Sequence, residues 1–155
     1  MKGLEQLLAE HAFFAGMEPK DLALIAGCGA NARFEAGDYL FREGEPADQF
    51  YLLRSGRVVV EVHDPARGTI TVLSAGEGEV LGFSWLMPPY RWVFDARALE
   101  LTRALVFDGA CLRDKCEADA RLGYDLLKRV TSVMMQRLEA ASVQLLDVYG
   151  GAAAR

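Results

Sequence analysis

The sequence predicts an α+β domain in which short antiparallel strands lie between helical segments at the two ends of the chain. From residue 33 to residue 107, glycines recur every few residues between short runs rich in Val, Phe, Tyr and Leu. This pattern is typical of an antiparallel barrel, sandwich or jelly roll. The segments on either side carry apolar residues at helical spacing instead. A chain of 155 residues is long enough for one self-sufficient core, so we expect a single domain.

Residues 3–29 form the first helical zone. Leu4 and Leu8 lie at helical spacing on one face, and His11 continues that face. We expect His11 to pack against the domain rather than to bind a metal. A second short helix begins at Pro19, because proline is favoured in the first turn of a helix.

The central zone, residues 33–107, contains one strand pair that is clearer than the rest. We expect residues 50–53 and 58–62 to form an antiparallel hairpin around Ser55-Gly56, with Gly56 supplying a positive φ. A second turn over residues 64–68 leads to a strand over residues 69–73.

The C-terminal zone is predicted to contain helices within residues 109–148. A short helix covers residues 109–114, and a long one runs from about residue 119 to Val148, with Gly150-Gly151 as its stop signal. The tail, residues 151–155, is expected to be disordered.

Apolar residues on the long helix are spaced 3, 4, 4, 3, 4 and 3 apart, which averages the coiled-coil period of 3.5. We call these residues the seam: Leu127, Val130, Met134, Leu138, Ala141, Leu145 and Val148. Because about eight turns of helix would outreach a small β-domain, we expect the seam to pair with a second copy in a homodimer. A helix that packs only on its own domain is the alternative.

Composition and charge exclude several classes of function. Seventeen basic and 22 acidic side chains give a net charge of −5. A surface that binds DNA or an anionic membrane directly usually carries a net positive charge instead. No apolar run approaches the length of a membrane span, and the N-terminus lacks the apolar region of a signal peptide. We therefore predict a soluble, cytoplasmic protein. Its three cysteines, Cys28, Cys111 and Cys116, are expected to be reduced thiols.

Catalysis is not expected either. Two distant histidines cannot supply the metal ligands of a cupin or another metal centre. No Ser-His-Asp or Cys-His set and no phosphate-binding Walker loop can be identified. We expect a protein that is not an enzyme and that needs neither a metal nor a cofactor.

Residues 34–62, FEAGDYLFREGEPADQFYLLRSGRVVVEV, closely resemble the first signature of the cyclic nucleotide-binding domain family. The shared positions are Gly37, Phe41, Gly44, Ala47, Tyr51 and Gly56. The stretch HAFFAGMEPKDLALIA, residues 11–26, resembles the helical lead-in of that family, and the resemblance covers residues 3–148. It implies an antiparallel β-roll (jelly roll) with N-terminal helices and a long C-terminal helix.

The resemblance also implies a regulatory sensor domain like that of catabolite-activator- and Fnr-type regulators. In those proteins a helix-turn-helix follows the long helix, whereas this sequence ends a few residues beyond Val148. We therefore expect a stand-alone sensor that acts on an unknown downstream protein rather than on DNA.

In this family, backbone amides and one arginine in a cassette between two strands hold the cyclic phosphate, and a glutamate after a glycine binds the ribose. The matching stretch is GEVLGFSWLMPPYRWVFDARA, residues 78–98. Gly82 matches the glycine, but Phe83 stands where the glutamate is usual, and Ser84 is a weaker substitute. Arg91 lies nine residues after Gly82 where about ten are typical, which places Trp92 at the arginine position in a gapless comparison.

These matches make Gly82, Phe83, Ser84, Arg91 and Trp92 the expected ligand-binding residues, with cAMP or cGMP as the expected ligand. Arg91 is the expected anion contact, because it is the only basic residue between Thr69 and Asp95. Without the glutamate carboxylate that binds the ribose, the site loses a hydrogen bond worth about 1.5–3 kcal/mol. The alternative is that the aromatic residues of the cassette close the pocket. The domain would then serve protein interaction or sense another small ligand. These aromatics are Phe83, Trp85, Tyr90, Trp92 and Phe94.

Overall fold

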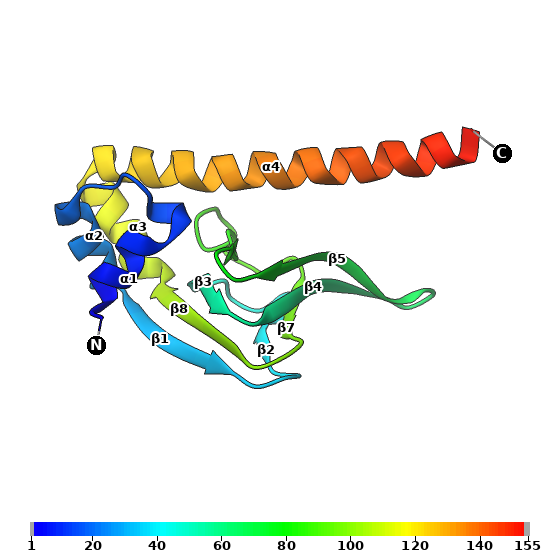
Figure 1. Ribbon diagram of the computed structural model, residues 1–155, viewed down its shortest axis with the longest axis horizontal. Coiled ribbons are helices and arrows are strands. Elements are labelled where there is room, and N and C mark those ends of the chain that lie inside the picture. The colour runs from blue at the N-terminus through cyan, green and yellow to red at the C-terminus, as the bar shows by residue number, and fades with distance from the viewer. Residues whose placement is uncertain (1, 154–155) are drawn as a thin grey trace.

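The computed structural model describes residues 2–153, and the side chains of residues 2–150 (Figure 1). The helical elements are α1 (Leu4–Glu10), the 3-10 helix η1 (Ala12–Phe14), α2 (Pro19–Ala26), α3 (Gly109–Ala118) and α4 (Ala120–Ala153). The strands are β1 (Gly29–Phe34), β2 (Tyr39–Phe41), β3 (Gln49–Ser55), β4 (Arg57–Asp64), β5 (Gly68–Gly76), β6 (Val80–Leu81), β7 (Asp95–Ala98) and β8 (Thr102–Asp108).

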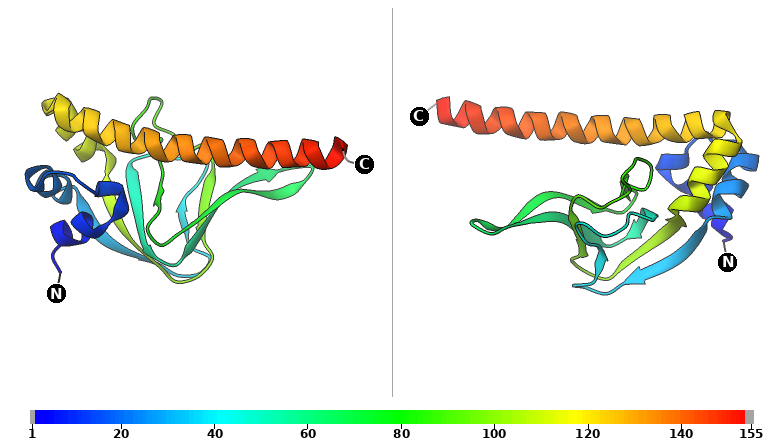
Figure 2. Two further views of the ribbon diagram at one scale, coloured as in Figure 1. Left: turned by 45° about the horizontal axis from the view of Figure 1, so that its top comes forward. Right: turned by 180° about the vertical axis from the view of Figure 1, so that it is seen from behind.

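The strands form two four-stranded antiparallel sheets, in the orders β1-β8-β3-β6 and β2-β7-β4-β5. The helices α1, α2 and α3 gather at one end of this roll, and α4 crosses above the strands (Figures 1 and 2). One buried apolar cluster joins the helices to the first sheet, and a second fills the interior of the roll. The α+β class and the β-roll predicted from the sequence are confirmed.

The predicted hairpin over residues 50–62 is wrong. In the described structure β3 pairs with β8 and β6, whereas β4 pairs with β5 and β7, so the two consecutive strands belong to different sheets. Gly56 turns the corner between them with the expected positive φ, +95°. A Cβ there would lie 2.6 Å from the Leu101 carbonyl oxygen, so this corner requires glycine. The second predicted turn is confirmed: it joins β4 to β5, and the Asp64 carboxylate accepts the Ala66 amide at 2.7 Å.

An ion pair with a buried carboxylate fixes α4 to the N-terminal helices. The Asp21 carboxylate on α2 is 1% exposed and accepts two hydrogen bonds from Arg121 Nη2, at 2.8 and 2.9 Å. Near the same end, the Arg129 guanidinium donates to the carbonyls of Phe13 and Ala15 at 2.8 Å each. Both arginines hold the first half of α4 against the helical end of the domain.

The long helix does not stop at the predicted signal. It continues through Gly150-Gly151 to Ala153. The prediction that the helix ends at Val148 is therefore wrong, because residues 149–153 are also helical. Gly150 does not have a positive φ. It therefore does not adopt the left-handed cap conformation that ends many helices. Glycine within a helix costs about 1 kcal/mol relative to alanine, and the helix tolerates it here. The prediction of a disordered tail is wrong for residues 151–153, which are helical, and residues 154–155 of that tail lie outside the described residues.

The seam is divided between the domain and its surface. Val130, expected to face a second copy, is instead 1% exposed and belongs to the core beside Leu122 and Leu126. The remaining large seam residues, Leu127, Met134, Leu138, Leu145 and Val148, are exposed. The end of α4 reaches beyond the tip of the β4–β5 hairpin (Figure 2). Its second half therefore presents apolar side chains that the described domain does not cover.

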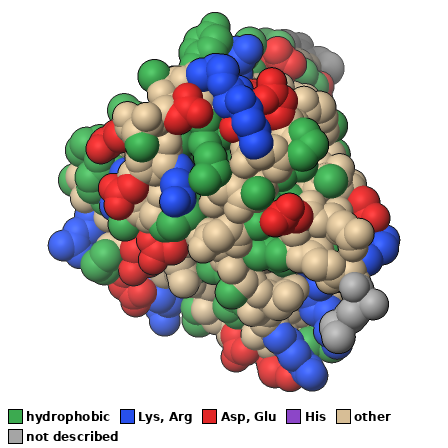
Figure 3. Space-filling view, turned by 90° about the vertical axis from the view of Figure 1, so that its left-hand side faces the viewer, with side chains coloured by type: hydrophobic (Ala, Val, Ile, Leu, Met, Phe, Trp, Pro, Cys, Tyr) green, Lys and Arg blue, Asp and Glu red, His purple; other side chains and the backbone are tan. Residues whose placement is uncertain are grey.

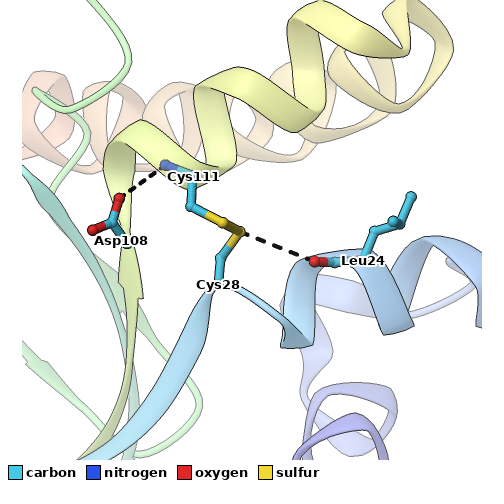
Figure 4. Close-up of a disulfide and its surroundings, with 4 residues drawn as sticks. All are labelled: Leu24, Cys28, Asp108 and Cys111. Atoms are coloured by element: carbon cyan, nitrogen blue, oxygen red, sulfur yellow. Dashed lines mark hydrogen bonds between the residues drawn. A yellow bond between two sulfur atoms is a disulfide. The ribbon is translucent and has the colours of Figure 1, made fainter.

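A disulfide joins Cys28, just before β1, to Cys111 in the first turn of α3, so the prediction of three reduced thiols is wrong. The Asp108 carboxylate caps α3 by accepting the Cys111 amide at 2.8 Å, and this holds Cys111 beside Cys28 (Figure 4). Cysteines 83 residues apart meet only through the tertiary fold. Cys116 is the free cysteine of the described chain.

The helical end of the molecule carries acidic and basic side chains interspersed over one face, with no extended patch of either sign (Figure 3). Across the described residues, the helices include none with the length and hydropathy of a membrane span.

Candidate functional site

The cassette joins β6 to β7. Residues 82–94 form a loop whose first part is a turn, closed by a 3.1 Å hydrogen bond from the Leu86 amide to the Phe83 carbonyl. Helix is absent from this described segment. Gly82 opens the loop with φ +87°. A Cβ at Gly82 would lie 2.8 Å from the Trp92 ring, so only glycine lets the indole pack against the chain here.

A cavity of about 340 Å³ lies between the cassette, the interior of the roll and α4. Its size is within the range of small-molecule sites. It is lined by Phe41, Val60, Leu73, Leu81, Gly82, Phe83, Ser84, Trp92, Val93, Phe94, Met134 and Arg137. The structure therefore brings together four of the five predicted site residues: Gly82, Phe83, Ser84 and Trp92.

Trp92 is built into the wall of the cavity. Its ring stacks on Phe41 with centroids 3.9 Å apart, and the side chain is 5% exposed. Its backbone is equally fixed, because its amide donates to the Glu45 carbonyl at 3.0 Å and its carbonyl accepts the Gly44 amide at 2.8 Å. The indole fills part of the interior, as the closed-pocket alternative expects, but it leaves the cavity open beside it.

Arg91 lies apart from the other predicted residues. It is exposed, its Nη1 donates to the Gly44 carbonyl at 3.2 Å, and it is absent from the described lining of the cavity. The cause is local backbone geometry: neighbouring residues in extended chain point to opposite sides. Because Trp92 points into the roll, Arg91 points out.

Arg97, the other arginine near the cassette, is already paired. From β7 it makes two hydrogen bonds to the buried Glu61 carboxylate on β4, from Nε at 2.9 Å and from Nη2 at 3.3 Å. Its guanidinium is therefore engaged within the roll.

A cation that the sequence analysis missed faces the cavity from α4. The Arg137 guanidinium is half-buried, donates from Nη2 to the Val80 carbonyl, and lies 5.4 Å from the centre of the Phe83 ring. No ion pair involves Arg137 in the described chain. Burial lowers the pKa of Arg137, with the negative charge of Glu79 opposing that shift, and arginine stays protonated.

The sequence did contain a signal for Arg137. Leu122, Leu126, Val130 and Val133 follow the inner face of α4 at helical spacing, and Arg137 is the next position on that face. A charged residue at the end of a buried apolar stripe is a candidate for function. The apolar seam, most of which is exposed, is the stronger pattern on this helix.

A second cavity, of about 550 Å³, lies on the other side of Arg137, between α4, η1 and the turn before β6. It also contains Arg129, which differs from Arg137 in being paired with a carboxylate. Besides its two carbonyl contacts, Arg129 pairs with Asp125 at 3.0 Å. Arg129 therefore has a structural role in joining α4 to the N-terminal zone.

The Asp95 carboxylate is buried next to the cassette and is also fully engaged. It accepts the Glu43 amide at 2.7 Å and the His63 Nε2 at 3.0 Å, and Arg42 Nε lies 3.7 Å away. These contacts fasten the end of the cassette to the loop after β2 and to the β4–β5 hairpin. Among the residues described, no group of three or more His, Cys, Asp or Glu side chains could hold a metal ion.

Comparison with known proteins agrees with this geometry. Residues 32–119, more than half of the chain, match the family described as "Cyclic nucleotide-binding domain". The chain belongs to the cyclic nucleotide-binding domain family. The match spans β2 to the end of α3 and so includes the whole cassette.

Two relatives show the range of this family. The chain is 25% identical over 147 residues to the CRP-like cAMP-activated global transcriptional regulator of Mycobacterium tuberculosis, covering 94% of this chain and 63% of the regulator. It is 40% identical over 52 residues to the cAMP-dependent protein kinase regulatory subunit of Emericella nidulans, or 34% of this chain and 13% of the subunit. The chain thus spans less than two thirds of the length of these relatives.

Solved structures share the fold over most of the chain. A cyclic nucleotide-binding-type protein from Geobacter metallireducens has a TM-score of 0.79 and 31% identity, covering 89% of this chain and 99% of that one. The regulatory subunit of a cAMP-independent protein kinase A from Trypanosoma brucei, solved as a triple mutant bound to cAMP in the A site, has a TM-score of 0.72 and 22% identity, covering 90% of this chain and 49% of that one.

Proposed function

We propose that this chain is a non-catalytic regulatory sensor domain whose ligand binds in the 340 Å³ cavity and whose response is carried by α4. One observation supports this most directly: the cavity is enclosed by the cassette on one side and by Met134 and Arg137 of α4 on the other. A ligand there touches both elements at once. Its binding energy can therefore shift the equilibrium between two positions of α4 relative to the roll.

A cyclic nucleotide, cAMP or cGMP, is the first candidate ligand, because of the family and because the relatives above are named for cAMP or were solved with it. The test is the melting temperature of the purified protein with and without millimolar cAMP or cGMP. A ligand at 100 times its dissociation constant adds about 2.7 kcal/mol to the free energy of unfolding. A clear rise is expected for a ligand, and an unchanged melting temperature contradicts that ligand.

A domain that senses another small ligand is the second candidate, and two observations favour it. Phe83 occupies the position where the family has the glutamate that binds the ribose, and Arg91 lies outside the described lining of the cavity. Both contacts that typify cyclic nucleotide recognition are thus altered. Melting temperatures that stay flat with both nucleotides support this candidate.

We also propose that α4 pairs with α4 of a second copy through the exposed part of the seam. Leu138 and Leu145 are 68% and 57% exposed and keep the coiled-coil spacing. Replacing both by Glu places like charges in the contact and should yield monomers by analytical ultracentrifugation. Val143→Glu, an exposed apolar position on another face of the helix, should leave the dimer intact. A wild-type monomer contradicts the proposal.

The response would then pass to a downstream protein rather than to DNA. The net charge of −5 opposes direct contact with phosphates. The exposed second half of α4 offers apolar surface for a protein contact.

A further inference from the structure

We infer that Arg137 holds the charge of the ligand and that the cavity selects an organic monoanion with a flat apolar body, of the aromatic carboxylate class. This inference rests on the proposed function, since it names the ligand class and the anion contact of the same cavity. It assigns to α4 a role that the cassette alone was expected to fill.

The first argument is the unmet capacity of the Arg137 guanidinium. An arginine carries five N–H donors in a planar fork, and the described contacts of Arg137 use one nitrogen, on the Val80 carbonyl. By contrast, Arg97 and Arg121 each pair with a buried carboxylate. A half-buried cation that forms no ion pair in the described chain gains from an anion beside it.

The second argument is the position of this cation. Arg137 lines the cavity that contains four of the predicted site residues, and it is the only basic residue in that lining as described. Phe83 lies beneath the guanidinium, where the family has a carboxylate. A glutamate at that position would be drawn into an ion pair with Arg137. The phenylalanine leaves the cation free for a ligand.

The third argument is the character of the walls. Apart from Gly82, Ser84 and Arg137, every residue in the described lining is apolar, and the wall includes the stacked rings of Phe41 and Trp92. A ribose and a purine carry several polar groups, and a buried polar group without a partner lowers affinity. A ligand with one anionic group and a flat hydrocarbon body leaves no such group unpaired.

The experiment compares charged and neutral probes on the full chain. Binding of 2-naphthoate, of its neutral amide 2-naphthamide, of cAMP and of cGMP is measured by isothermal titration calorimetry. We expect 2-naphthoate to bind more tightly than the amide by about tenfold, as for a charge-assisted contact. It should also bind more tightly than either nucleotide. A nucleotide that binds more tightly than 2-naphthoate overturns the ligand class.

Two arginine variants test the anion contact. Arg137→Gln should weaken 2-naphthoate by about tenfold and leave 2-naphthamide unchanged, whereas Arg91→Gln should leave both unchanged. Arg137→Lys should bind with intermediate affinity, because a point charge replaces a fork. It serves as the test should the Gln variant fail to fold, as judged by circular dichroism and urea unfolding. Dependence on Arg91 instead of Arg137 overturns the inference.

The outcomes separate the two proposals. If a nucleotide binds through Arg91 and 2-naphthoate does not bind, the inference fails and the sensor function stands. If neither 2-naphthoate nor a nucleotide binds the wild type at millimolar concentration, the inference fails and so does the cyclic nucleotide as the ligand of the sensor.

Discussion

Replacing Gly82 by Ala is expected to destabilise the protein through two separable effects. The backbone at Gly82 has φ +87°, and the left-handed region costs an L-residue about 1–2 kcal/mol. The added Cβ would also lie 2.8 Å from one carbon of the Trp92 ring and 3.0 Å from another. Trp92 is stacked on Phe41 and cannot easily retreat, so overpacking adds about 1–3 kcal/mol. The total loss in the free energy of unfolding is about 2–5 kcal/mol.

Urea unfolding of the wild type, Gly82→Ala, Trp92→Leu and the double variant separates the two effects. In a Trp92→Leu background the added methyl meets no ring, so Gly82→Ala should cost only the backbone term, about 1–2 kcal/mol. Gly78→Ala is the matched control, because Gly78 has φ +83° but open space around its Cβ position. It should also cost about 1–2 kcal/mol. If the losses in the free energy of unfolding for Gly82→Ala and Trp92→Leu add within about 0.5 kcal/mol, the contact between the two residues is not the cause of the destabilisation.

Three further predictions concern the scaffold. Reducing the bond between Cys28 and Cys111, which are 83 residues apart, should lower the free energy of unfolding by up to about 4.6 kcal/mol in the chain-entropy estimate; urea midpoints with and without dithiothreitol that coincide contradict it. Burial lowers the pKa of His11 below 6.5, so the unfolded chain binds the proton more readily and stability should fall as pH drops below 6.5. A His11→Gln variant should lack that part of the pH profile of the melting temperature. Asp21→Asn should lower the urea midpoint by weakening the contact with Arg121, and an unchanged midpoint contradicts this role.

The sequence predicted most of the architecture because its signals are local. Glycine spacing marks the corners of the roll, and apolar spacing marks the helices. The pairing of β3 was not predictable in this way. A strand that follows another after a short turn can enter the same sheet or the opposite one, and Gly56 permits both. Buried residues on both faces of β3 and β4 show that each is covered, but not by which strand.

The candidate site also contains residues that a local pattern can locate and one that only tertiary packing brings in. Gly82, Phe83, Ser84 and Trp92 are close in sequence, so a local motif located them together. Arg137 comes from a helix far along the chain and meets the cassette only through tertiary packing. Arg91 lies outside the described lining of the cavity because neighbouring residues in an extended segment point to opposite sides, and Trp92 points inward.

The Cys28–Cys111 bond has a mechanical consequence. All eight strands lie between the two cysteines, so the roll is enclosed in a covalent ring from which the N-terminal helices and α4 emerge. A force applied to the two ends of the chain passes from α2 through the sulfur atoms to α3 and α4, and the strands carry none of it. In optical tweezers the oxidised protein should release only the helical segments, and dithiothreitol should add the length of the roll to the extension. Under load, α4 would peel away with Met134 and Arg137, so tension on the helix would open the cavity while its cassette side stays folded.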